Sequence, residues 1–125
     1  MPQPRISRFE LELLEQLWVL GPCSVREIQE KLPEKDRPAY TTVQTMIYRL
    51  EEKKAVRRVK KIGNAHIFEA VLTKKSVYKR LIDDFLDLFG GSPQPVMAQL
   101  LESGKLSLAD FRAAEKVLRD AGKKS

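Results

Sequence analysis

The stretch YTTVQTMIYRLEEKK, which runs from Tyr40 to Lys54, decides the fold. Its apolar residues recur at the i, i+3, i+4 and i+7 spacing that predicts one buried face of a helix. This pattern makes the stretch the helix around which the other elements are arranged. The four residues of the apolar face are Val43, Met46, Ile47 and Leu50.

The opposite face of this helix carries hydroxyls and a guanidinium, where an ordinary solvated face would carry Glu and Lys. Thr41 and Gln44 match a T-x-x-Q capping box, which puts the hydroxyl-rich end at the positive end of the helix dipole, where a phosphate is favoured. This chemistry suits a nucleic-acid groove. An amphipathic core helix with a small-polar outer face is the alternative. The polar face consists of Thr41, Thr42, Thr45, Tyr48 and Arg49.

Two helices are predicted before this stretch. Ser7 and Glu10 form a capping box for a core helix that ends at Leu20, before Gly-Pro. A second S-x-x-E box at Ser24 opens a short helix to Leu32. The segment PEKDRP, residues 33–38, has a proline at each end and therefore predicts the turn into the Tyr40 helix.

After this helix the hydrophobic period changes to that of strands. AVRRVKKI and HIFEAVL predict a β-hairpin around Gly63 and Asn64, both of which can adopt positive φ. Lysines and arginines can protect the edge of a sheet against aggregation, but four of them within five residues are more than this role requires. Three helices followed by a basic hairpin is the winged-helix arrangement, in which the third helix enters the major groove. The four cations are Arg57, Arg58, Lys60 and Lys61.

A helical pattern resumes at Thr73 and is broken by Gly-Gly-Ser-Pro at residues 90–93. A short helix around Met97 follows, and Ser107 with Asp110 caps a final one. Three helices in about 50 residues bury too little surface for an independent core, so a second copy should complete it, with packing on the N-terminal domain as the alternative. The predicted fold is mainly α with a small β-hairpin wing: a winged helix-turn-helix domain over residues 1–72 and a helical dimerisation domain over 73–125.

Composition favours a polyanionic partner. The formal net charge is +6, and residues 1–75 hold 15 Lys and Arg against 10 Asp and Glu, while residues 76–125 hold 8 against 7. The basic excess therefore lies with the predicted DNA-binding helix.

One cysteine, Cys23, and one histidine, His66, provide neither a catalytic set nor a metal site, and no nucleotide-binding glycine pattern occurs. We therefore expect no catalytic residue, no metal and no cofactor. The lone cysteine predicts a reducing compartment, and no apolar run is long enough for membrane insertion or secretion. The expected location is the cytoplasm.

The run TTVQTMIYRLEEKKAVRR, the GNAHIFEA turn and the segments FLDLFGGS and SLADFRAAEKVLRD resemble the penicillinase-repressor family of bacterial transcriptional regulators. The resemblance covers nearly the whole chain. It implies a homodimer with a winged helix on each subunit and intertwined C-terminal helices, which binds a palindromic operator in double-stranded DNA and represses transcription. Gln44 stands where relatives often have arginine. The predicted DNA-binding residues are Thr41, Thr42, Gln44, Thr45, Tyr48, Arg49, Arg58, Lys60 and Lys61.

The predicted dimerisation surface consists of the large apolar residues of the C-terminal helices. The dimerisation residues are Leu81, Ile82, Phe85, Leu86, Phe89, Leu100, Leu101, Phe111 and Leu118.

Two departures from the family concern induction. A membrane sensor protease cuts some members at an Asn-Phe bond, whereas the corresponding place here reads Gln99-Leu100. The resemblance makes these two residues the candidate cleavage region and such a protease a candidate partner, but the different residue pair leaves induction by cleavage open. The cysteine-rich motif of copper-responsive members is absent.

An alternative function from a different class is a winged helix used for protein recruitment, without specific DNA readout. In that case the C-terminal helices would be the working surface and the basic excess would serve solubility. A mobility shift with duplex DNA at moderate salt separates the two functions.

Overall fold

The computed structural model describes residues 5–123, which form six helices and three short strands. The chain divides into two compact units, of which the first ends at Arg80 and the second begins at Leu81, inside α4. The mainly α fold with a small wing is therefore confirmed. The elements are α1 (Arg8–Leu20), β1 (Cys23–Ser24), α2 (Val25–Lys31), α3 (Tyr40–Glu52), β2 (Val56–Ile62), β3 (Ala65–Ala70), α4 (Lys74–Asp87), α5 (Gln94–Glu102) and α6 (Leu108–Lys123).

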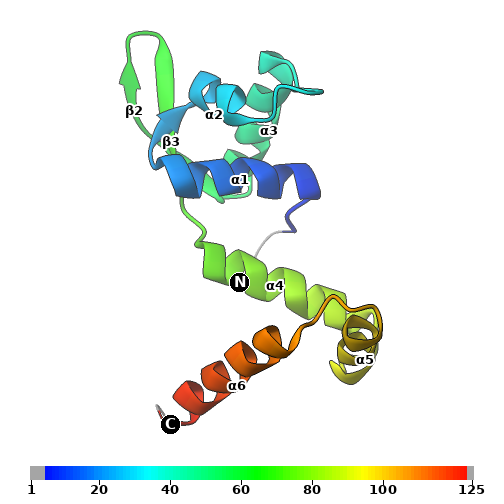
Figure 1. Ribbon diagram of the computed structural model, residues 1–125. Helices are drawn as coiled ribbons and strands as arrows, with labels where there is room; N and C mark the ends of the chain where they lie inside the picture. Colours follow the sequence, from blue (N-terminus) through cyan, green and yellow to red (C-terminus); the bar gives the residue numbers. More distant parts are fainter. Residues whose placement is uncertain (1–4, 124–125) are drawn as a thin grey trace. The chain divides into compact units, whose positions relative to one another are not determined.

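The core of the first unit lies where α1, α2 and α3 meet the sheet (Figure 1). Of the four residues predicted for the apolar face of α3, Val43, Ile47 and Leu50 are fully shielded from solvent, whereas Met46 is only half-buried. Helix α1 contributes Leu13 and Leu14 to the same core. The apolar face of α3 is thus fixed against α1 and α2, which leaves its polar face outward.

Local signals set most of the helix ends in this unit. Both predicted S-x-x-E capping boxes form: the Glu10 amide donates to Ser7 Oγ at 3.2 Å, and the Glu27 amide donates to Ser24 Oγ at 3.2 Å. Helix α3 ends in a Schellman motif, in which Lys54 adopts φ 64° and the Ala55 amide donates to the Leu50 carbonyl at 2.9 Å.

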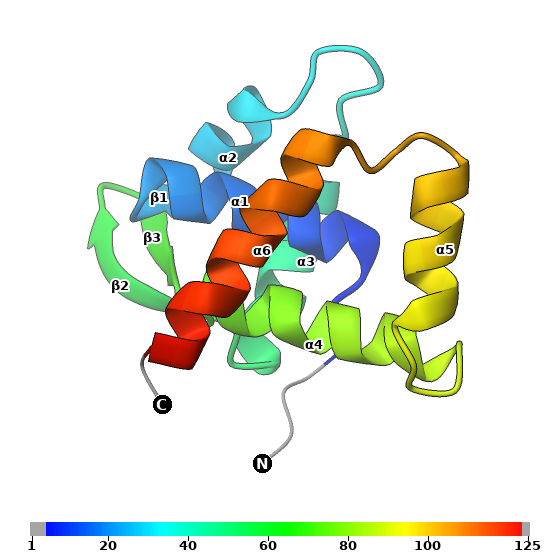
Figure 2. The ribbon, with the colours of Figure 1, turned by 60° about the horizontal axis from the view of Figure 1, so that its bottom comes forward.

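The sheet has the order β1-β3-β2 and is antiparallel throughout (Figure 2). The predicted hairpin is confirmed, and Gly63 adopts φ 60° in its turn, whereas Asn64 does not adopt positive φ. Strand β1 was not predicted, because two residues, Cys23 and Ser24, carry no periodicity of their own and are extended by pairing with β3. The pairing ties the start of α2 to the wing.

The turn between α2 and α3 is held by side chains that bond backbone carbonyls. The Arg37 guanidinium donates to the Leu32 carbonyl at 2.7 Å and to the Glu30 carbonyl at 2.9 Å. Gln29 Nε2 donates to the Pro38 carbonyl at 3.0 Å. The charged turn predicted over residues 33–38 is confirmed, and these bonds fix the point at which α3 begins.

The second unit contains the end of α4 together with α5 and α6. The Ser107–Asp110 cap of α6 forms, since the Asp110 amide donates to Ser107 Oγ at 3.1 Å and the Ser107 amide donates to Asp110 Oδ2 at 2.9 Å. From Leu81 to Gly122, however, no described side chain is buried. These helices therefore expose the apolar faces that the sequence gives them.

Candidate nucleic-acid interface

The solvent-facing side of α3 carries the predicted small hydroxyls and one cation. Thr41, Thr42, Thr45 and Arg49 are exposed and together with Met46 line a shallow depression. Thr45 Oγ1 donates to the Thr41 carbonyl at 2.9 Å, so its hydroxyl proton is used within the helix and its lone pairs and methyl group face outward. This face can therefore accept a hydrogen bond from a base edge or contact a thymine methyl, and Arg49 can donate to a guanine.

The predicted Thr41–Gln44 capping box does not form, and that prediction was wrong. Ala39 is the N-cap, no side chain caps the helix, and Thr41 lies inside its first turn. The helix begins earlier because contacts with α2 hold its start: the Arg26 guanidinium lies 4.8 Å from the centroid of the Tyr40 ring, and Gln29 fixes Pro38. The uncapped amides remain suited to an anion.

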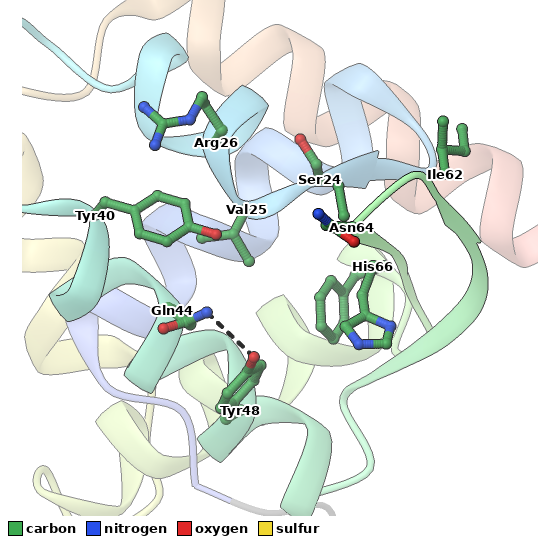
Figure 3. A pocket seen from close by; sticks show the side chains of 11 residues that line it. Ser24, Val25, Arg26, Tyr40, Gln44, Tyr48, Ile62, Asn64 and His66 are labelled. Atoms are coloured by element: carbon green, nitrogen blue, oxygen red, sulfur yellow. Dashed lines mark hydrogen bonds between the residues drawn. The ribbon is translucent and has the colours of Figure 1, made fainter.

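Gln44 and Tyr48 do not lie with the threonines but on the flank of α3 that faces the wing (Figure 3). Gln44 Nε2 donates to the Tyr48 hydroxyl at 3.2 Å. The Tyr48 ring packs against Phe68 of β3 with centroids 6.3 Å apart. The predicted DNA-binding residues of α3 therefore divide into two groups on adjacent sides of one helix.

Arg58 is occupied by contacts within the protein. Its Nε donates to a Glu51 carboxylate oxygen at 2.8 Å, and its guanidinium carbon lies 5.0 Å from the Tyr48 centroid and 5.4 Å from the Phe68 centroid. A guanidinium held between a carboxylate and two rings joins the wing to α3. Arg58 therefore helps to orient the hairpin relative to α3.

The remaining wing cations differ in whether they form an ion pair within the protein. Arg57 pairs with Glu69 across the hairpin at 2.8 Å. The strand register shifts between Arg58 and Lys60, which places a bulge at Val59. Beyond it Lys60 and Lys61 are exposed, and neither has an ion pair within residues 5–123. These two lysines are the wing cations available to a phosphate.

A groove of about 450 Å³ lies between α2, α3 and the hairpin (Figure 3). The sequence analysis named Gln44 and Tyr48 as DNA-binding residues but did not name the five other polar residues around the groove among them. No periodic pattern links these five, because they come from separate elements that only the fold brings together. The five residues are Ser24, Arg26, Tyr40, Asn64 and His66.

A buried ion pair locks the C-terminal end of α3 to α1. Lys53 Nζ donates to both Glu10 carboxylate oxygens at 2.7 and 2.8 Å and to the Arg5 carbonyl at 2.9 Å. Burial raises the pKa of Glu10, but the bonds from Lys53 and the Ser7 amide outweigh it and lower that pKa overall. Sequence reasoning recognised Glu10 as a capping residue only, since nothing local identifies Lys53 as its partner.

The described part of the chain holds neither a reactive thiol nor a group of metal ligands. Burial raises the pKa of Cys23 to about 11, which makes the thiol unreactive at neutral pH. Between residues 5 and 123, no three His, Cys, Asp or Glu side chains are grouped as metal ligands require. Within the same range no helix has the length and apolarity needed to cross a bilayer.

Eight of the nine predicted dimerisation residues lie on α4, α5 and α6, and the ninth, Phe89, lies in the turn after α4. Several are largely solvent-exposed, including Ile82 at 56%, Leu101 at 55% and Leu118 at 73%, while Leu81, Leu86 and Leu100 are half-buried. The rings of Phe85 and Phe89 contact each other with centroids 5.1 Å apart. Gln99 and Leu100 lie inside α5, where the Gln99 carbonyl accepts from the Ser103 amide at 3.0 Å.

The family model described as Penicillinase repressor matches residues 6–120. This range includes both compact units and nearly all of the side chains described above. None of the curated proteins compared with the chain matches it.

Proposed function

This chain belongs to the penicillinase repressor family of transcriptional regulators, and from that premise we propose that it is a sequence-specific repressor. In this proposal a homodimer in the bacterial cytoplasm binds a palindromic operator. Residues 1–72 bind DNA and residues 73–125 dimerise. Each α3 lies in a major groove, with the two half-sites about one helical turn apart.

The main support for the proposal is the outer face of α3. Thr41, Thr42, Thr45 and Arg49 are exposed on a helix that is anchored in the core by Val43, Ile47 and Leu50, so its hydroxyls and guanidinium are held outward. The free lysines of the wing, Lys60 and Lys61, supply cations for the flanking backbone. Phosphate contacts of this kind position a protein, and base contacts give it specificity.

The exposed apolar faces of the second unit support the proposed dimerisation. Leu88 is 80% exposed, Leu118 73% and Val117 67%, in a segment that has no buried side chain between Leu81 and Gly122. A second copy of the same helices would shield these faces. One winged helix also makes few contacts for operator affinity at physiological salt, so we expect dimerisation and DNA binding to be coupled.

Arg49→Ala tests base readout. If Arg49 donates to a guanine edge, the variant should lose about 1 to 3 kcal/mol of operator binding and relax the preference at one position in each half-site. Binding of wild type and variant to operator and to random duplex is measured by fluorescence anisotropy. An equal loss on both duplexes would make Arg49 a phosphate contact instead.

The double substitution of Lys60 and Lys61 by alanine tests the wing. It should weaken binding to every duplex and reduce the slope of log affinity against log salt by about 0.9 for each phosphate that the wing no longer neutralises. Substituting Lys74 and Lys75, two adjacent exposed lysines outside the wing, is the matched control. A slope that changes equally in both variants would remove the wing from the DNA interface.

The first experiment is affinity selection of genomic fragments by the purified protein at two salt concentrations. Recovery of one inverted repeat at the higher salt supports the dimeric repressor. Salt-sensitive capture of all fragments with no shared motif would contradict sequence-specific repression and favour the protein-recruitment function.

Derepression by a membrane sensor protease is not part of the proposal. The Gln99-Leu100 bond lacks the Asn-Phe pair that the resemblance associates with cleavage. It also lies within α5, so a protease would first have to open that helix.

A further inference from the structure

The groove between α2, α3 and the wing is lined on its polar side entirely by groups that can donate a hydrogen bond. Among the described residues around it there is no carboxylate. One guanidinium, one imidazole, three hydroxyls and two amides face a space of about 450 Å³. The donors are Ser24, Arg26, Tyr40, Gln44, Tyr48, Asn64 and His66.

The internal hydrogen bonds leave most of these donors unused. Ser24 Oγ accepts from the Glu27 amide, and the Tyr48 hydroxyl accepts from Gln44, so both hydroxyl protons remain available. The Asn64 and His66 side chains lie beside the open space (Figure 3). A set of donors without a carboxylate acceptor is complementary to an anion.

We propose that this groove seats a backbone phosphodiester of the bound DNA, with Arg26 as its charged contact and His66 and Tyr40 as further hydrogen-bond donors. The inference rests on the proposed function and adds α2 and β3 to the DNA-contacting elements. The seat is continuous with the polar face of α3 through Gln44 and Tyr48, and with the free lysines through Lys61, which pairs with His66 across the hairpin.

The test measures binding to a labelled duplex of about 30 base pairs and mixed sequence, since a backbone contact requires no operator. Arg26→Gln should weaken binding at least about tenfold and reduce the salt slope by about 0.9 per groove. Lys31→Gln removes the same charge from an exposed position on the same helix, outside the groove, and should leave the slope unchanged. Equal slopes of log affinity against log salt for Arg26→Gln and wild type would contradict a phosphate contact in the groove.

Two further variants protect the test against a folding artefact. Tyr40→Phe keeps the ring that Arg26 covers and removes only the hydroxyl, so it should weaken binding with no loss of thermal stability. His66→Phe keeps an aromatic ring and removes both ring nitrogens, so it should weaken binding to the duplex. An affinity equal to that of wild type would exclude His66 from the seat.

The arms of the experiment separate the possible failures and the possible sources of phosphate. If wild type binds no duplex, the proposed function fails together with the seat; if it binds and the groove variants match it, only the seat fails. Inorganic phosphate, titrated at constant ionic strength and followed by NMR at His66 and Tyr40, should not bind saturably. Saturable binding that displaces the duplex would assign the groove to a free phosphate and overturn the DNA seat.

Discussion

The winged-helix unit and the segment after Arg80 bury their apolar residues very differently. In the first unit Leu13, Ile28 and Ile47 are fully shielded, whereas Leu88 and Leu118 in the second are 80% and 73% exposed. Both segments consist largely of amphipathic helices, so the helical pattern alone does not distinguish them. The first unit completes its core within one chain, while the second offers faces that a partner must cover. Substitutions in the first unit should therefore change the folding equilibrium, and substitutions in the second unit should change the equilibrium between monomer and dimer.

The largest expected effect is on the folding of the first unit. Ile47→Ala removes three carbons from a fully buried site and should reduce the free energy of unfolding by about 2 to 5 kcal/mol. Urea unfolding followed by Trp18 fluorescence measures it. Trp18 is the only tryptophan, and its Nε1 donates to the Leu72 carbonyl at 3.0 Å, so it reports on this unit.

Leu101→Ala is the matched control in the second unit, where the side chain is 55% exposed. It should leave unchanged the urea unfolding transition that Trp18 fluorescence reports, called the Trp18 transition below. It should weaken only the association of two subunits. A Trp18 transition that shifts as much for Leu101→Ala as for Ile47→Ala would show that the two units share one core, which would contradict the difference between them.

The second prediction concerns association. Phe85 is 44% exposed and contacts Phe89 at 5.1 Å between ring centroids. Phe85→Asp would place a charge in the proposed interface, so dimerisation should weaken by about 2 kcal/mol or more, and operator binding should weaken with it. Sedimentation equilibrium measures the dimer, and the Trp18 transition should stay near that of wild type.

Ala113→Asp adds the same charge at an exposed position of α6 outside the proposed dimerisation residues and is the control. It should remain dimeric. A Phe85→Asp variant that stays dimeric and binds operator normally would place Phe85 outside the interface.

Spacing and capping patterns predicted much of the fold because those interactions lie within a few residues. The boxes at Ser7, Ser24 and Ser107 form as their sequences indicate. The similar pattern at Thr41 does not, because contacts from Arg26 and Gln29 start α3 before it. A local signal therefore predicts a helix end only where no neighbouring element competes.

The parts of the candidate site that the sequence could not predict depend on distant residues. Strand β1 exists because Cys23 and Ser24 pair with β3, and the groove exists because α2 and the hairpin meet beside α3. Arginine is a residue type that often contacts phosphates, but the Arg58 side chain is bound by Glu51, which lies on another element. Residue type and period indicate what a side chain can do, and the fold decides which partner it reaches.

The third prediction concerns Glu10, which connects two helices of the first unit. Glu10→Gln should cost about 1 to 3 kcal/mol at pH 7, because Lys53 loses a charged partner. The pKa of Glu10 is lowered in the folded state, so its contribution is fully present above the ordinary value of 4.5 and is lost as the pH falls through the lower folded value. The difference in the free energy of unfolding between wild type and variant, measured by urea unfolding, should therefore narrow below pH 4.5.

Glu115→Gln provides the contrast from the second unit. Glu115 pairs with Arg119 on the same helix, and both side chains are exposed, so the pair joins no two elements. Its loss should change stability by less than about 0.5 kcal/mol and should not alter the acid dependence of the Trp18 transition. If Glu10→Gln is equally mild and its gap to wild type does not depend on pH, the ion pair does not hold α3 to α1. The position of the DNA-facing helix would then rest on its apolar face alone.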